Sequence, residues 1–222
     1  MPHFIFHNTE DGSISHITKD GEHLATSVTL VHPNQIIRTY FQAAARALVV
    51  HDAAVGIDEK IQIGVQGFLA SLFGLEAFLN VFFLIAAREH GNVALEHSVE
   101  NSKLQVISKL KNWPYQLYGA YIQNQRNVCG RLRWLYDVRN NLVHPRMEWS
   151  TLWTNGLAID GVVENPQRPL ADSAYCQQAF ELTLLAVLRI GSISGTHNTS
   201  QFCGHWTGIQ AIESELATRL EL

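Results

Sequence analysis

An arginine and a histidine in the second half of the chain, with an asparagine beside the arginine, have types and spacing suited to acid–base chemistry on a phosphate. They are Arg139, Asn140 and His144. An imidazole can remove and donate protons near neutral pH, and a guanidinium can hold the charge that develops on a phosphate. Asn140 lies one helical turn before His144, so its amide can orient the imidazole. The three residues predict a phosphodiester-cleaving site. The alternative is that His144 only caps a helix end.

The segment 126–143 is predicted to be an amphipathic helix with Arg139 on its apolar face. At about 100° per residue, Arg139 falls between Leu132 and Leu135 in angular position, whereas Arg133 falls on the polar face. The helix should end at His144, because a residue that precedes a proline is disfavoured in the α conformation. A guanidinium keeps its proton, so an arginine on an apolar face needs an anion there.

A longer apolar helix, predicted at 62–90, also has polar residues on a face where apolar residues are expected. Glu76 and Asn80 form a narrow polar stripe on it. We expect Glu76 to face Arg139, or to line the same solvent-poor cleft, with Asn80 nearby. A purely structural buried ion pair is the alternative. The helix is long enough to cross a membrane, but a carboxylate at the bilayer centre costs about 2.5–3.5 kcal/mol. We therefore favour a buried central helix.

The other elements predict a mainly α-helical bundle with a small β-rich N-terminal extension. Residues 1–33 should form this extension, because short β-like runs at 3–7 and 27–32 surround the turn pairs Asp11-Gly12 and Asp20-Gly21. Residues 34–222 should form the helical domain. Its further helices are predicted at 35–51, 102–111 (stopped by Asn112-Trp113-Pro114), 174–190 and 208–220. Between them we expect a loop at 150–172 with a small hairpin at 157–163, and a polar linker after 190.

Composition and charge indicate a globular, cytoplasmic protein. The 222 residues are 46% hydrophobic and 16% charged, which does not suggest disorder. The three cysteines are far apart, which argues against a disulfide framework, and the N-terminus does not resemble a signal peptide. The net charge of −4 is uneven, because residues 101–150 hold eight Lys and Arg but two acidic residues. Such a zone is typical of polyanion binding, and a solvated helix surface is the alternative.

The run from Leu135 to Pro145 resembles the signature of the HEPN superfamily, the higher eukaryote and prokaryote nucleotide-binding domains. Arg139, Asn140 and His144 occupy the places of its arginine, polar residue and histidine, and Leu75-Glu76-Ala77-Phe78-Leu79-Asn80 is similar to a run in the second helix of such domains. The resemblance covers roughly residues 35–190.

Membership would imply a helical bundle that forms a homodimer and joins both motifs across a two-fold axis. Many members are metal-independent endoribonucleases of toxin–antitoxin, defence or RNA-processing systems, so the resemblance implies RNA as substrate, 2′,3′-cyclic phosphate products, and an antitoxin or regulatory protein as a further partner. It implies no metal, no other cofactor and no membrane. Arg139 would bind the scissile phosphate, His144 would act as acid and base, and Asn140 would orient. Supporting or substrate-contacting candidates are Glu76, Asn80, Arg133 and Arg146.

Two other function classes compete with this interpretation. A metal-dependent hydrolase would have to use the cluster of His197, Cys203 and His205, although Cys203 and His205 are too close in sequence for a usual zinc pair. The non-enzymatic alternative is a HEPN-like helical interaction or nucleotide-binding module that has lost catalysis.

Overall fold

The computed structural model describes residues 4–8, 14–23, 34–143, 149–154, 157–163 and 167–222, which belong to two compact units, 1–32 and 33–222. The smaller unit holds a three-stranded antiparallel sheet in the order β1 (Phe4–Asn8), β2 (Ile14–Lys19), β3 (Glu22–His23). Asp20 and Gly21 both have positive φ and connect β2 to β3, as an Asp-Gly pair predicts. The predicted run at 27–32 and the pair Asp11-Gly12 lie outside the described residues.

The larger unit is mainly α-helical, which confirms the predicted class. Its helices before the hairpin are α1 (Gln35–Ala53), α2 (Ile57–Glu89), α3 (Val93–Glu100), α4 (Val106–Tyr118) and α5 (Gln125–Val143). An antiparallel hairpin follows, made of β4 (Trp149–Thr154) and β5 (Leu157–Val163). The chain then forms the 3₁₀ turn η1 (Arg168–Ala171), α6 (Ser173–Ile193), α7 (Thr199–Thr207) and α8 (Glu213–Arg219).

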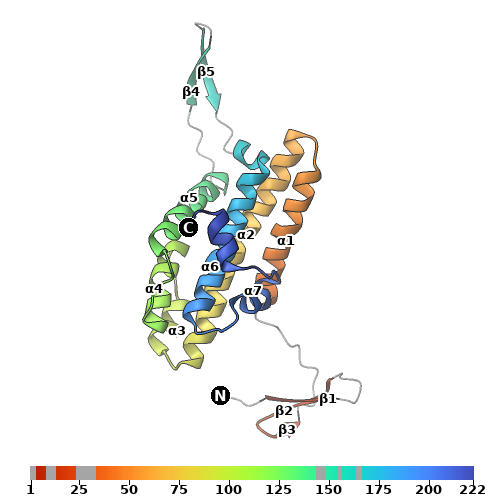
Figure 1. The fold of residues 1–222 in the computed structure, drawn as a ribbon, viewed down its shortest axis with the longest axis vertical. Helices are drawn as coiled ribbons and strands as arrows, with labels where there is room; N and C mark the ends of the chain where they lie inside the picture. The colour runs from red at the N-terminus through yellow and green to blue at the C-terminus, as the bar shows by residue number, and fades with distance from the viewer. Residues whose placement is uncertain (1–3, 9–13, 24–33, 144–148, 155–156, 164–166) are drawn as a thin grey trace. The chain divides into compact units, whose positions relative to one another are not determined.

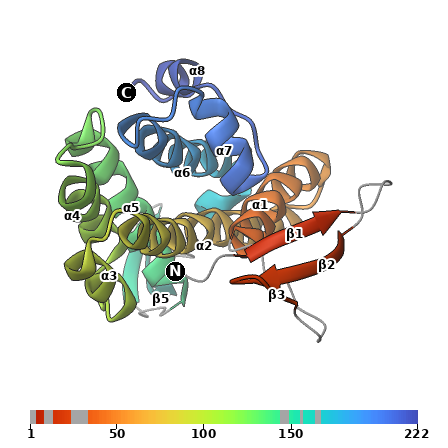
Figure 2. The same cartoon turned by 90° about the horizontal axis from the view of Figure 1, so that it is seen from below.

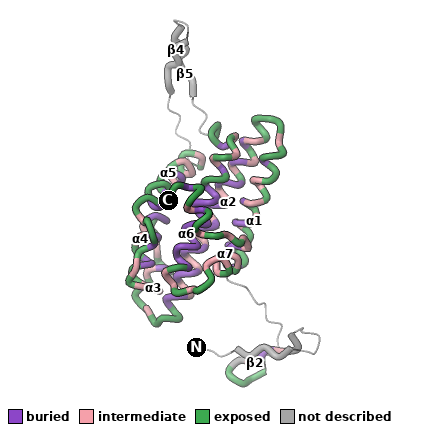
Figure 3. The backbone as a smooth tube through the Cα atoms, in the orientation of Figure 1, coloured by how far each residue is buried: buried purple, intermediate pink, exposed green. Residues whose placement is uncertain are grey.

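Helix α2 is the centre of this bundle. It packs against α1, α3, α4 and α6, and Figures 1 and 2 show α1 along one side of it and α3 to α5 along the other. Two glycines allow close approach: a Cβ at Gly64 would clash with the Leu170 carbonyl, and one at Gly74 would lie 2.9 Å from the Phe41 ring. Buried residues concentrate on α2 and α6 (Figure 3). These two helices therefore contribute about half of the buried core residues.

By length and composition, α2 could also cross a membrane, and it is the one helix of the described chain that passes this test. Half of its most hydrophobic window is buried inside the protein. Its packing among four other helices fits the interpretation as a central helix of the bundle.

The predicted end of the helix at 102–111, which corresponds to α4, is wrong. The sequence placed it before Asn112-Trp113-Pro114, but α4 continues to Tyr118 with Pro114 inside it. Proline removes one helical hydrogen bond, yet Trp113 and Pro114 are both buried, and their packing offsets that loss. Gly119, in the left-handed conformation, ends the helix instead.

Two more segments form regular structure where the sequence predicted a loop or a linker. The polar residues after 190 include α7, because the Asn198 side chain accepts from the Gln201 N–H and Cys203 and Trp206 are buried. The small hairpin expected within 157–163 is instead the single strand β5, which pairs with β4, a strand formed mostly by residues of the predicted loop at 150–172. Helix α3, capped by Asn92, was not predicted. The terminal helix α8 is shorter than the predicted 208–220.

Candidate functional site

Arg139 lies against the apolar core of the bundle, as its helical position predicted. Helix α5 buries Val128, Leu132 and Leu135, and Arg139 continues this row one turn later. Its guanidinium carbon lies 5.3 Å from the centre of the Phe73 ring on α2, a favourable cation–π distance. The Nε atom is buried and has no hydrogen-bond partner among the described residues. One donor of this cation is therefore out of water and unused.

Two residues predicted to act together with Arg139, Asn140 and His144, come after it in the same segment of the chain. Arg139 Nη1 donates to the exposed Asn140 Oδ1 at 3.2 Å, so these two polar side chains are in contact. Helix α5 is described as far as Val143, and its predicted end at the His144-Pro145 step lies outside the described residues. His144 and Arg146 lie outside the described residues, which stop at 143 and resume at 149.

The expected direct pairing of Glu76 with Arg139 is wrong. None of the ion pairs among the described residues includes either side chain. Both charges nevertheless affect the pKa of Tyr136 on α5. Burial raises the pKa of this phenol well above its usual value, the Glu76 charge raises it further, and the Arg139 charge opposes the rise. Its hydroxyl donates to the Leu72 carbonyl of α2 at 2.9 Å. A neutral tyrosine thus joins the two helices beside both charges.

Asn80 contacts a lysine that the sequence reasoning did not single out. Lys109 on α4 is 4% exposed, and its Nζ donates to Asn80 Oδ1 at 2.8 Å. The ammonium lies 5.4 Å from the centre of the Trp113 ring. Burial lowers the pKa of Lys109, against the opposing effect of the Glu76 charge. A pattern does point to it, because Lys109 falls among Val106, Leu110 and Trp113 at helical spacing, as Arg139 does on α5.

Arg133 is not brought together with these residues. It is exposed on α5, six residues and therefore about 120° from Arg139 around the helix. Its charge affects Cys129. Burial raises the pKa of this thiol, and the charges of Lys111 and Arg133 oppose the rise. Arg133 can contact a polyanion only on the outer surface of α5.

The competing metal cluster is divided between different environments. Cys203 is fully buried, and burial raises its pKa to about 11, although a hydrogen bond with Thr207 opposes this. A thiol in this state is a poor metal ligand. His197 and His205 instead line a shallow depression beside Phe202. No group of three or more His, Cys, Asp or Glu side chains that could hold a metal ion occurs in the part of the chain that the structure describes.

The region between α2, α4 and α5 thus combines two cations, Lys109 and Arg139, with the carboxylate of Glu76, and neither cation is in an ion pair with it. Such an arrangement has an excess of positive charge and can hold an anion. No protein-family model, curated protein or solved structure matches this chain. The role of this region is therefore argued from its chemistry.

Proposed function

We propose that this chain is a metal-independent endoribonuclease of the HEPN type, with Arg139 as the phosphate-binding residue. One observation carries the proposal: Arg139 places a guanidinium against Phe73 with its buried Nε atom unpartnered by any described residue. A buried donor without a partner is costly to the fold. The phosphate of a bound RNA would supply a charged acceptor for it, so the cost is compensated when substrate binds.

The reaction needs no more than proton transfer and charge stabilisation. His144 removes the proton of the ribose 2′-OH, the 2′ oxygen forms a bond to phosphorus, and the bond from phosphorus to the 5′ oxygen breaks. The leaving 5′ oxygen takes up a proton, which His144 or its counterpart in a second copy donates. Arg139 holds the negative charge on the phosphoryl oxygens. The products are a 2′,3′-cyclic phosphate and a 5′-hydroxyl.

A second copy of the chain is part of the proposal. Helix α2 has a row of apolar side chains that are only partly buried and that continue from Phe73 along one face: Leu69, Phe73, Ala77, Val81 and Leu84. Arg139 borders this row through Phe73. A homodimer that covers the row would remove apolar surface from water and bring two copies of Arg139 toward a common cleft. An RNA-cleaving toxin, a defence nuclease or an RNA-processing enzyme would fit this chemistry.

The test is RNA cleavage in excess EDTA by the wild-type chain and by Arg139→Met and His144→Ala. Loss of one such group typically lowers the rate about 100-fold or more, so both variants should leave RNA nearly intact, and wild-type products should carry 2′,3′-cyclic phosphates. Matched controls are Arg126→Met, which removes an exposed arginine of the same helix, and His97→Ala, which removes an exposed histidine of α3.

Intact RNA after incubation with folded wild-type protein would contradict the nuclease and favour a non-catalytic module. Cleavage that requires a divalent metal would contradict it as well. The dimer is tested separately by light scattering after chromatography: Ala77→Arg should yield monomers, and a wild-type monomer that still cleaves RNA would overturn the dimeric site.

A further inference from the structure

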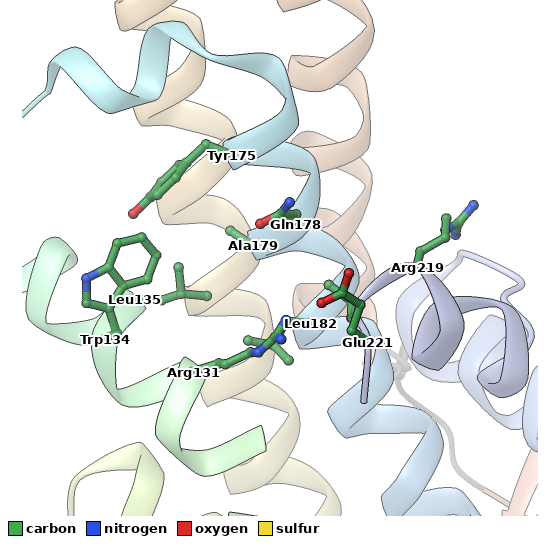
Figure 4. A pocket seen from close by; sticks show the side chains of 10 residues that line it. Arg131, Trp134, Leu135, Tyr175, Gln178, Ala179, Leu182, Arg219 and Glu221 are labelled. Atoms are coloured by element: carbon green, nitrogen blue, oxygen red, sulfur yellow. The ribbon is translucent and has the colours of Figure 1, made fainter. Parts of the chain in front are cut away.

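A pocket lies on another side of α5, away from Arg139. It is bounded by α5, α6 and the residues after α8, and its volume is about 410 Å³ (Figure 4). Its floor is apolar, because Leu135, Ala179 and Leu182 are each at most 4% exposed. Small-molecule sites usually have volumes of about 300–1,000 Å³ and apolar linings with a few polar groups. The pocket therefore has the size and the floor of a ligand site.

One wall of this pocket is aromatic. Trp134 is 56% exposed, which is a large apolar surface to leave in water. The Tyr175 ring meets it edge-on, with ring centres 5.3 Å apart. An exposed indole at the mouth of a pocket offers a flat surface on which a planar ring can stack.

One polar side chain can contact the edge of such a ring. The Gln178 amide, which can both donate and accept, lines the same pocket and lies between Tyr175 and Glu221 in Figure 4.

The charges of the pocket select the ligand further. Arg219 already binds Glu181 at 3.0 Å, but Arg131 and Glu221 take part in none of the ion pairs of the described residues. Figure 4 shows both extending along the pocket at the end opposite Tyr175. A ligand that satisfies both needs a negative group for the guanidinium and N–H donors for the carboxylate. A nucleotide has both, in its phosphate and in the amino or imino groups of its base.

We infer that this pocket binds a single nucleotide unit. The base stacks on Trp134 and presents its polar edge to Gln178 and Glu221, while Arg131 holds the phosphate. The site is separate from the proposed cleavage site, because Trp134 is about 140° around α5 from Arg139 and Arg139 does not line the pocket. The inference does not depend on nuclease activity. The nucleotide is either free in solution or one unit of a bound RNA strand.

The test is calorimetric titration of the full chain with AMP, GMP, CMP and UMP, each used separately. At least one should bind with a stoichiometry of one per chain. Trp134→Ala and Arg131→Met should each weaken that binding roughly tenfold or more, because stacking on an aromatic ring makes a contribution of that size. Arg126→Met, which removes an exposed arginine of the same helix outside the pocket, should bind as the wild type does.

Competition with a short DNA oligonucleotide, which lacks the 2′-OH and cannot be cleaved by the proposed mechanism, separates the two sources. Displacement of the mononucleotide by the oligonucleotide, lost in Trp134→Ala, assigns the pocket to a unit of a strand; no displacement assigns it to a free nucleotide. The inference is overturned if none of the four mononucleotides binds at millimolar concentration, or if Trp134→Ala, shown to be folded by circular dichroism, binds as tightly as the wild type.

Discussion

The ends of two helices show how differently the fold treats an arginine in apolar surroundings. Near the C-terminal end of α6, Arg189 is 1% exposed, and each of its three nitrogens has a partner: Nη1 donates to the Gln123 carbonyl at 2.8 Å, Nη2 approaches the Leu222 carbonyl at 3.5 Å, and Nε lies 3.4 Å from a Glu213 carboxylate oxygen. Near the end of α5, Arg139 has one contact of 3.2 Å with its neighbour Asn140, and its buried Nε donates to no described residue.

This difference separates a structural cation from one that is available for binding. Arg189 joins α6 to the segment before α5, to α8 and to Leu222, so each of its nitrogens has a partner within the protein. Buried polar groups in native proteins are nearly always satisfied in this way. Arg139 is one of the exceptions among the described residues, and an exception at a charged group is more informative about function than one more satisfied pair. Substitutions at the two arginines should therefore have opposite consequences.

The largest effect on stability is expected from Arg189→Met. Methionine keeps much of the aliphatic volume but leaves Glu213 and two carbonyl groups without their donor. Removal of one partner from a buried ion pair typically costs about 3–5 kcal/mol. Urea denaturation followed by circular dichroism should show a loss of this order. A loss below about 1 kcal/mol would mean that these contacts are not structural.

Lys109 lies between these two extremes, because it is buried, has a hydrogen bond to Asn80 and takes part in no ion pair with a described residue. Its pKa in the folded protein is lowered from the usual 10.5. Between the lowered value and 10.5 the unfolded chain binds more protons at this position than the folded chain, so the free energy of unfolding should rise with pH across that window.

Lys109→Met should remove this rise. The measurement is urea denaturation of both proteins at several alkaline pH values, compared as the difference between wild type and variant. A difference that is constant with pH would show that the ammonium is not held in a desolvated position.

The smallest effect on stability is expected from Arg139→Met, which retains an apolar side chain beside Phe73 and removes one exposed hydrogen bond to Asn140 and a buried Nε donor without a partner among the described residues. Its free energy of unfolding should change by no more than about 0.5 kcal/mol, while RNA cleavage is lost. Thermal or urea unfolding beside the cleavage assay checks both. If Arg139→Met were as destabilised as Arg189→Met, Arg139 would be structural and the contrast between the two arginines would disappear.

Much of the bundle could be predicted from the sequence, because its long helices have strong periodic patterns. The helices at 35–53, 125–143 and 173–193 agree with the predicted ranges to within three residues at each end. The errors lie where local rules meet packing. Pro114 is accepted inside α4 because that turn is buried, and a polar stretch became α7 because Asn198 caps it and Trp206 packs onto the core.

For the candidate site, the sequence located Arg139 on an apolar face, but the direct ion pair that it suggested between Arg139 and Glu76 is absent from the described residues. A helical projection shows only the direction in which a side chain leaves its own helix. It contains no information on which helix lies opposite or at what distance. The contact between Lys109 and Asn80, and the position of Tyr136 beside both Glu76 and Arg139, depend on how α4 and α5 are placed on α2.

The sequence by itself determined that this is a mainly helical chain and that one arginine is directed into apolar surroundings, because both properties follow from the spacing of residues within a single helix. The same spacing describes Arg189 on α6 equally well. Only the tertiary structure decided that each nitrogen of Arg189 has a partner and that Nε of Arg139 has none among the described residues. The partners of Arg189 come from positions 24 to 66 residues away along the chain. Contacts over such separations are made by packing of the whole bundle and are not encoded in any local pattern.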